Sequence, residues 1–168
     1  MFVAALALLA AGGAALTPPR PPTEVAPLTV YPPTLPPKVV ASYPADGAAV
    51  APGVLVLKLT FDQRMAGTGF DLAPVADAEA PHCLKTPRLL NDGKTFVVLC
   101  TLLPGKSYAL ALNAGPAGGF TNETERRAAP ASLRFTTTTG EPVRSLDAAM
   151  KLESLTGLEV PVQEGPGS

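Results

Sequence analysis

The feature that most constrains this sequence is a series of short apolar segments, separated by turn residues, between Val39 and Thr138. Apolar and polar side chains alternate within most of them, which is typical of strands that have one buried face. No helical period lies between the segments, so a βαβ fold is disfavoured. We predict seven strands, over residues 39–43, 54–61, 70–76, 83–90, 95–100, 107–113 and 131–138.

The alternation also predicts which side chains face the core. In the second segment, the apolar residues Leu55, Leu57, Leu59 and Phe61 share one face. The inward residues of the later segments are Phe96, Val98, Cys100, Tyr108, Leu110, Leu112, Leu133 and Phe135. This pattern favours an all-β fold, an immunoglobulin-like antiparallel β-sandwich of about seven strands.

Two turns add detail to this prediction. Asn91-Asp92-Gly93-Lys94 supplies the residues that tolerate positive φ in a hairpin, Gly93 above all. The stretch 103–108 (LPGKSY) resembles the turn before the sixth strand of many sandwiches, where a Tyr hydroxyl bonds to nearby backbone. We therefore expect structural roles for Tyr108 and for Pro104 and Gly105 of its turn.

The chain begins with an uncharged apolar run over residues 2–16. This run is shorter than the ~20 residues that a membrane-spanning helix needs, and it matches the hydrophobic core of a secretory signal. We expect residues 1–16 to be a signal peptide cleaved after Ala15, although no Lys or Arg precedes the run. A buried N-terminal helix is the alternative. Export would place the protein in the periplasm or at the cell surface, without a transmembrane segment in the mature chain.

Residues 17–37 are rich in proline and end in Pro36-Pro37. Proline fixes φ and removes a hydrogen-bond donor, so we expect an extended spacer. A ligand for a proline-recognising domain is the alternative.

Cys83 and Cys100 are the only cysteines. In an exported chain such a pair implies a disulfide, and the two lie on either side of the turn at residues 91–93. The bond would add roughly 3 kcal/mol by restricting the unfolded chain. A zinc site is the rival interpretation, but two Cys and one nearby His do not complete a tetrahedral set.

Residues 140–168 form a tail with a predicted short helix from Ser145 to Gly157. Ser145 suits the N-cap, Asp147 the first turn and Gly157 the end. Leu146 and Met150 contribute to a narrow apolar stripe that would dock on the sandwich or on a partner.

Five motifs in order resemble the SbsA-type immunoglobulin-like domain of bacterial surface-layer proteins. They are Pro44 with Asp46 and Gly47; Phe61 with Asp62 and Met65; Asp92 to Thr95; Leu103 to Tyr108; and Phe135 with Thr137. The resemblance covers residues 37–139, so we expect the domain to span 38–139. It implies an adhesive or spacer module of envelope proteins, without an enzymatic role. The loop at residues 115–130 departs from the family's usual D-x-x-G-N pattern.

A second resemblance, over residues 42–65, is to periplasmic copper-binding proteins of the CopC type. Those proteins bind Cu(II) through histidines, one of them at the mature N-terminus. No His lies near the expected cleavage site here, and imidazole is the ligand that copper most needs. The missing histidine weakens the copper interpretation. A periplasmic carrier of copper or calcium remains the alternative function.

The remaining candidates for chemistry are few. His82 is the only histidine, and a disulfide at Cys83 would remove the adjacent thiol nucleophile, so we expect His82 to be a surface residue. Asp71, Asp77 and Glu79 offer oxygens of the kind that calcium binds, but without the spacing of a known loop motif.

Asn122-Glu123-Thr124 matches a glycosylation acceptor. The net charge is -1, and the densest positive spot, Arg126-Arg127, is too short to follow a phosphate backbone, so we expect no binding to nucleic acid.

These observations predict a non-catalytic exported module without a cofactor. Its partner would be another envelope protein, contacted by the sandwich or by the C-terminal helix. A non-catalytic subunit of an envelope enzyme or transporter, docked through that helix, is the third possibility.

Overall fold

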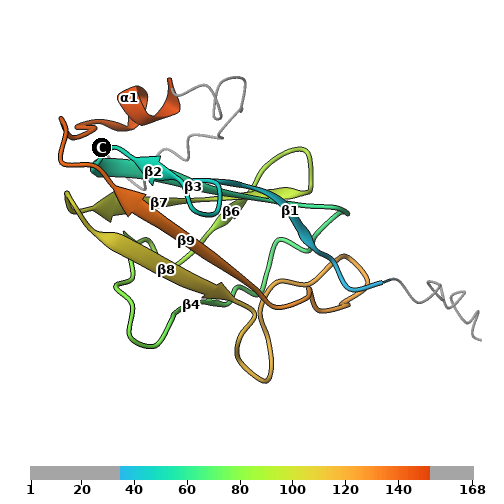
Figure 1. The fold of residues 1–168 in the computed structure, drawn as a ribbon. Helices are drawn as coiled ribbons and strands as arrows, with labels where there is room; N and C mark the ends of the chain where they lie inside the picture. Colours follow the sequence, from blue (N-terminus) through green and yellow to red (C-terminus); the bar gives the residue numbers. More distant parts are fainter. Residues whose placement is uncertain (1–34, 152–168) are drawn as a thin grey trace, which may run out of the picture. The chain divides into compact units, whose positions relative to one another are not determined.

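The computed structural model describes residues 35–151. The described strands are β1 (Val39–Tyr43), β2 (Ala49–Val50), β3 (Gly53–Phe61), β4 (Leu72–Pro74), β5 (His82–Cys83), β6 (Arg88–Leu89), β7 (Thr95–Leu102), β8 (Ser107–Leu112) and β9 (Ala131–Thr137), followed by helix α1 (Leu146–Met150). They form two facing sheets (Figure 1). The predicted all-β sandwich is confirmed. The predicted signal peptide and most of the predicted spacer lie outside the described residues.

One sheet has the strand order β1-β3-β7-β5, with β6 also paired to β7. The other has the order β2-β9-β8-β4. Neighbouring strands are antiparallel except β2 and β9, which run parallel through the pairs Ala49↔Thr136 and Val50↔Thr137. The longest ladder joins β3 to β7. Because β1 lies in the first sheet and β2 in the second, the chain crosses from one sheet to the other between them.

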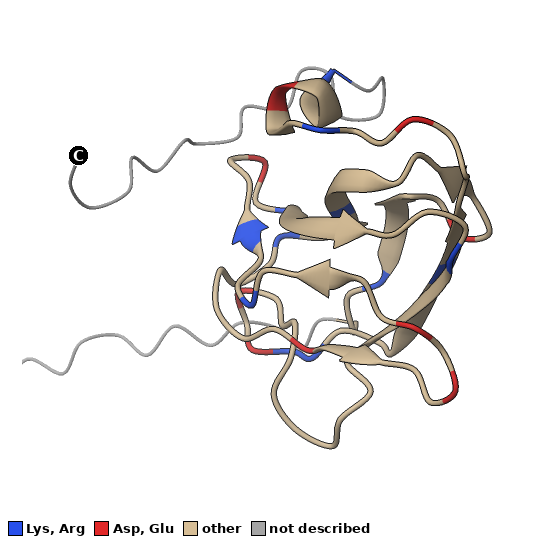
Figure 2. Cartoon of the chain, turned by 90° about the vertical axis from the view of Figure 1, so that its left-hand side faces the viewer, with Lys and Arg blue, Asp and Glu red and all other residues tan. Residues whose placement is uncertain are grey.

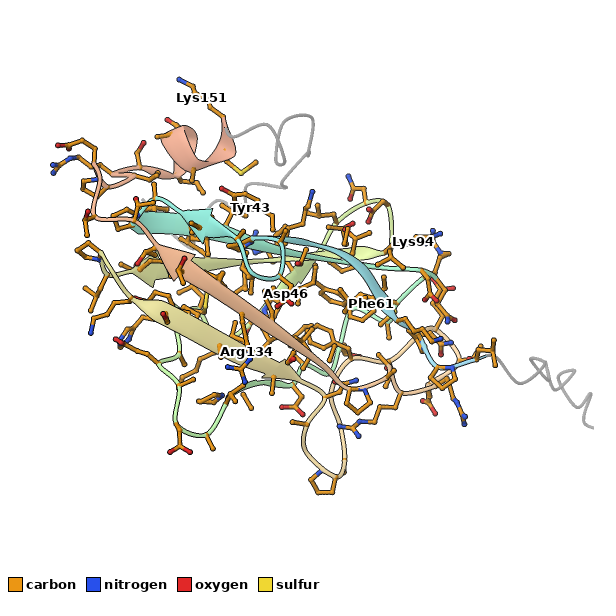
Figure 3. The ribbon with its side chains drawn as sticks, viewed as in Figure 1. Tyr43, Asp46, Phe61, Lys94, Arg134 and Lys151 are labelled. Carbon is orange, nitrogen blue, oxygen red and sulfur yellow. A yellow bond between two sulfur atoms is a disulfide. The ribbon has the colours of Figure 1, made fainter. Side chains whose placement is uncertain are left out.

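The core lies between the two sheets and is formed by the inward face that the alternation predicts. The buried residues Leu55, Leu57, Leu59 and Phe61 of β3 face this core. The rings of Phe61, Phe96 and Phe120 contact one another, with centroid separations of 5.0–6.0 Å. Figure 3 shows Phe61 among the side chains between the sheets. Burial of these large apolar surfaces is the main force that holds the two sheets together.

Helix α1 covers the outer face of the first sheet, where Val56 and Val97 are buried together with Ala149 of the helix. The Ser145 hydroxyl accepts the N–H of Ala148 at 3.1 Å, so this residue is the N-cap that the sequence predicts. Ala149 is fully buried. The helix therefore docks on the sandwich of its own chain. Its predicted end at Gly157 lies outside the described residues.

Two predicted strands are shorter in the structure than expected. The segment 70–76 pairs only from Leu72 to Pro74, because Pro74 has no N–H to donate and Asp77 adopts a positive φ of 61°. The segment 83–90 is divided into β5 and β6, since Pro87 interrupts the pairing with β7. The two-residue strand β2 was not predicted, because nothing in so short a segment shows alternation.

Candidate functional site

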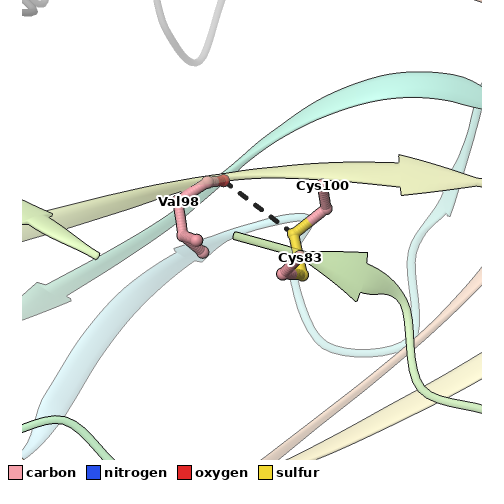
Figure 4. The surroundings of a disulfide bond; sticks show 3 residues. All are labelled: Cys83, Val98 and Cys100. Atoms are coloured by element: carbon pink, nitrogen blue, oxygen red, sulfur yellow. Dashed lines mark hydrogen bonds between the residues drawn. A yellow bond between two sulfur atoms is a disulfide. The ribbon is translucent and has the colours of Figure 1, made fainter. Parts of the chain in front are cut away.

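Cys83 and Cys100 lie directly opposite each other on β5 and β7 and are joined by a disulfide (Figure 4). Their Cα atoms are 3.9 Å apart. The Cys100 side chain is buried and its Sγ lies 3.9 Å from the Val98 carbonyl oxygen. The bond fastens the two-residue strand β5 to the sheet, and neither sulfur is a free thiol.

His82 precedes the disulfide on β5 and pairs with Thr101. Its side chain is exposed. Within residues 35–151, no three side chains among His, Cys, Asp and Glu are arranged to hold one metal ion. The structure therefore places His82 on the surface of an edge strand and does not bring it together with the acidic residues.

Tyr108 lies at the start of β8 with its ring buried against Phe135, at a centroid distance of 5.5 Å. Its hydroxyl accepts the backbone N–H of Leu103 at 2.8 Å. Gly105, between these two residues, has the positive φ of 65° that the turn requires. This arrangement is the tyrosine corner that the stretch 103–108 resembles.

Thr137 at the end of β9 closes the same corner from the opposite side. Its hydroxyl donates to the Leu103 carbonyl at 2.7 Å and accepts the Lys106 N–H at 2.9 Å. The corner thus joins the loop after β7 to the last strand. The F-x-T pattern that contains Phe135 and Thr137 has a structural function here.

Asp92 organises the hairpin between β6 and β7. One carboxylate oxygen accepts the N–H groups of Lys94 and Thr95 at 2.9 Å, and the other accepts the Thr95 hydroxyl at 2.6 Å. Partial burial acts to raise the pKa of Asp92, but these hydrogen bonds and the charge of Lys94 together lower the pKa below its ordinary value. Gly93 has a φ of 67°, as the turn prediction expects.

Asn113 is a buried polar residue that the sequence analysis did not identify. It is 1% exposed and leaves β8 with a positive φ of 52°. Its amide group donates to the carbonyls of Phe120 and Ala128 at 3.0 Å and accepts the Phe120 N–H at 2.8 Å. Gly119 lies so close that a Cβ there would overlap the Asn113 oxygen. Asn113 therefore holds the long β8–β9 loop against the core.

Asp71 and Arg127 hold the tip of the same loop. Asp71 accepts the Gly115 N–H at 3.0 Å and lies 3.8 Å from the Arg127 guanidinium. Arg127 also donates to the carbonyls of Asn113 and Gly115, at 2.9 and 2.6 Å. This loop differs in sequence from the pattern of the resembled family, and it is ordered here by its own polar contacts.

The other two acidic residues considered as calcium ligands lie elsewhere. Glu79 pairs with Lys106 at 3.2 Å, and Asp77 lies in the turn that follows β4. The structure does not gather Asp71, Asp77 and Glu79 into one site. Figure 2 shows Lys and Arg interspersed with Asp and Glu over the described residues.

Asn122, whose sequence context matches a glycosylation acceptor, is 3% exposed. Its side-chain oxygen accepts the N–H groups of Thr124 and Arg126, and its nitrogen donates to Gln63 at 2.9 Å. In the folded chain this amide holds the loop around Asn122 in place.

Every fully buried side-chain nitrogen or oxygen of the described residues has a hydrogen-bond partner.

An open groove with a volume of about 460 Å³ follows one side of the sandwich, between β1 and β9. Val40 and Ala41 of β1 and Ser132 of β9 line it. Val40 is 62% exposed. The groove is shallow and its lining is mainly aliphatic. Asp46 is the one ionisable residue among the residues that line it.

The chain enters the sandwich beside the last residue of β3, and the segment after β9 passes the first residue of β3 before α1 folds back over the outer face of the sheet. At the entry, Lys38 bonds to Asp62, and Val39 pairs with Phe61 at the last residue of β3. After β9, Val143 pairs with Gly53 at the first residue of β3. Nine residues of strand separate these points by roughly 26 Å, at about 3.3 Å per residue step.

Comparison with known proteins gives limited similarity. No family model matches the chain, and no curated protein matches it. Among solved structures, the surface layer protein SbsC, domains 1-6, is 19% identical, with a TM-score of 0.42. The match covers 65% of this chain and 14% of the SbsC chain. The fold assignment rests on the strand pairing described above.

No helix within residues 35–151 has the length and hydrophobicity to cross a membrane.

Proposed function

We propose that this chain is a non-catalytic, exported immunoglobulin-like module that serves as a structural or protein-interaction element of a bacterial cell envelope. The observation that carries the proposal is that the disulfide and the buried polar groups of the described residues all hold the sandwich's own strands, turns and loops together. A rigid domain of this kind suits a structural or protein-interaction element.

Three observations support an extracytoplasmic location. The chain has a disulfide between Cys83 and Cys100, and such bonds persist mainly in oxidising compartments. The uncharged apolar run at residues 2–16 matches the core of a secretory signal. The ordered motifs from Pro44 to Thr137 add the resemblance to SbsA-type envelope domains. We place the chain in the periplasm or at the cell surface on these grounds.

The non-catalytic assignment is supported by what the polar side chains contact. Asp92 and Asn122 each accept three hydrogen bonds from backbone N–H groups or a nearby hydroxyl. Asn113 accepts one from the Phe120 N–H and donates two to backbone carbonyls. Asp71 and Arg127 bond to the loop backbone. These groups stabilise turns and loops of the sandwich, which is the role expected of them in a structural module.

The test is crosslinking of the full chain in the envelope of producing cells, with and without residues 140–168. The proposal predicts crosslinks to one or a few extracytoplasmic proteins. If the sandwich is the contact surface, they remain after the deletion; if α1 and the tail are the contact, they disappear. Recovery of the full chain from the cytoplasm, with no crosslinked envelope protein, would contradict the proposal.

A further inference from the structure

We propose that the edge strand β1 and the groove beside it form a self-association surface, on which β1 of a second copy pairs antiparallel to β1 of the first. This inference rests on the proposed function, because it names the contact surface and one partner of an interaction module. It requires an unpaired backbone edge, space beside that edge, and charges that match when two copies meet. The described residues meet these three conditions.

The edges of the two sheets differ in how they are protected. β4 ends in Pro74, β6 contains Arg88, β5 is fixed by the disulfide at Cys83, and β2 has only two residues. Short strands, charges and prolines are the usual means by which an edge avoids pairing with another chain. β1 is the longest edge strand of the described residues, and its sequence VVASY contains neither a charge nor a proline. This edge is therefore the one best suited to accept a strand.

The outer side of β1 has no backbone partner among the described residues. β1 pairs with β3 alone, and no other backbone hydrogen bond of the described chain involves residues 39–43. A bulge at Val40 shifts the register, and Ala41 to Tyr43 then continue in regular pairing with β3. Val40 is 62% exposed. A strand added at this edge would pair with backbone groups that are otherwise open to water.

The facing edge of β9 is open near the entry end and occupied farther along. Arg134 N–H donates to the Asp46 carboxylate at 2.8 Å, and the Arg134 carbonyl accepts the Gly47 N–H at 2.7 Å. Figure 3 shows Asp46 and Arg134 near each other. Because the direction of backbone groups alternates along a strand, those of Ser132 point to the same edge, and no residue of the described chain bonds to them. The groove of about 460 Å³ lies between this open part of β9 and β1, and the buried Leu59 is among its lining residues.

The open and occupied parts of the groove are complementary in a symmetric pair. A twofold axis through the middle of β1 brings the far end of one groove, which residues 45–47 occupy, to the open end beside Ser132 of the second copy. The two β1 strands then continue the first sheet from one copy into the other. Such a contact uses the same patch on both copies.

The charges at the two ends of the groove determine the direction of pairing. Lys38 precedes β1 at the entry end, Asp46 lines the far end, and residues 39–45 between them are uncharged. Both side chains are exposed, and the Lys38 ammonium group forms no ion pair within residues 35–151. Antiparallel pairing brings Lys38 of each copy to Asp46 of the other, whereas parallel pairing brings like charges together.

The size of the contact limits its strength. A pairing along one five-residue edge is smaller than the interface of a stable dimer. We therefore expect a concentration-dependent equilibrium between monomer and dimer. This behaviour suits a chain that is concentrated at one site in an envelope.

The experiment is sedimentation equilibrium of the full chain over a series of protein concentrations. Lys38→Glu and Asp46→Lys should each weaken the dimer about tenfold or more, because each places like charges at both ends of the contact. An equimolar mixture of the two variants should recover the wild-type equilibrium, since the mixed dimer has opposite charges at both ends. Lys85→Glu, at an exposed lysine that follows β5, is the matched control and should leave the equilibrium unchanged.

A second pair of variants keeps the test decisive if Asp46→Lys does not fold. Val40→Asp places a charge on the exposed edge and should abolish the dimer, whereas Val40→Thr keeps a β-branched, uncharged side chain and should retain it. Circular dichroism checks that each variant is folded.

Two results would overturn the self-association surface. One is a full chain that stays monomeric at every concentration, and the other is a dimer that neither Lys38→Glu nor Val40→Asp weakens. If either result is found while the chain still crosslinks to other envelope proteins, the proposed interaction function stands and β1 is not its self-pairing surface. Recovery of the chain from the cytoplasm would instead count against the proposed function itself.

Discussion

The hydroxyl of Tyr108 accepts the backbone N–H of Leu103 over 2.8 Å, across the turn that joins β7 to β8. Tyr108 is 3% exposed, so this hydrogen bond lies at the buried edge of the core. The same turn is bonded from the other side by Thr137. The corner therefore couples three strands, and it yields the first prediction.

Tyr108→Phe should reduce the free energy of unfolding by about 1–3 kcal/mol, because the Leu103 N–H loses its acceptor while the ring packing is retained. Urea unfolding followed by circular dichroism measures the change. Tyr43→Phe is the control: Tyr43 is half-buried, burial raises its pKa, and no hydrogen bond of its hydroxyl occurs within the described residues. If Tyr108→Phe lowers the free energy of unfolding no more than Tyr43→Phe does, the bond between Tyr108 and Leu103 does not stabilise the fold.

Replacement of both cysteines by alanine should lower the free energy of unfolding by roughly 3 kcal/mol, because the cross-link at Cys83 and Cys100 restricts the unfolded chain. Urea unfolding with and without a reductant provides the measurement. The reductant should lower the midpoint of the wild-type protein and leave the double variant unchanged. Identical midpoints for the oxidised wild-type protein and the double variant would contradict a stabilising bond.

Asn113→Ala should lower the free energy of unfolding by more than about 3 kcal/mol. It leaves three buried backbone groups without partners, the carbonyls of Phe120 and Ala128 and the Phe120 N–H, and each such group costs about 1–3 kcal/mol. Asn91→Ala, in the exposed hairpin turn, is the matched control and should stay within about 0.5 kcal/mol of wild type. Thermal unfolding of both variants measures the difference. Similar melting temperatures would show that Asn113 does not organise the loop.

The Asp92 carboxylate should contribute to stability at neutral pH and lose this contribution in acid. Its pKa is lower in the folded chain than in the unfolded chain, where it is about 3.9. The contribution is therefore full above the unfolded value and disappears as pH falls through the folded value. Urea unfolding of Asp92→Asn and wild type should differ at pH 7 and converge toward about pH 2. A difference that is independent of pH would contradict this role.

Added copper or calcium should leave the melting temperature of the full chain unchanged. An ion that binds only the folded state raises stability with its concentration, whereas here Asp71 and Glu79 are paired with Arg127 and Lys106. Differential scanning calorimetry over a series of ion concentrations makes the measurement. A melting temperature that rises with either ion would favour the carrier function instead.

Much of the fold follows from period-2 alternation, which is a local property. The inward faces of β3, β7, β8 and β9 were all predicted, because each strand has one face against a shared core. The corner at Tyr108 and the turn at Gly93 were predicted from turn chemistry, which is also local. The helix N-cap at Ser145 was also predicted from a local signal.

What the sequence does not reveal depends on contacts between distant residues. The short parallel pair β2–β9 has too few residues for a pattern, and it forms only because the chain crosses between sheets after Tyr43. Asn113 looks like an ordinary strand end, yet its amide is satisfied by residues 7 and 15 positions later. Pro87 in the middle of the segment 83–90 was the available signal that this segment would divide.

We propose that the chain acts outside the cytoplasm as a disulfide-stabilised structural module. The most direct measurement treats intact producing cells with a membrane-impermeant thiol reagent, then fractionates them and analyses the peptides that contain Cys83 and Cys100 by mass spectrometry under non-reducing conditions. We predict that the chain is recovered outside the cytoplasm with the two peptides cross-linked and neither cysteine modified. Recovery from the cytoplasm with free Cys83 and Cys100 would contradict the account.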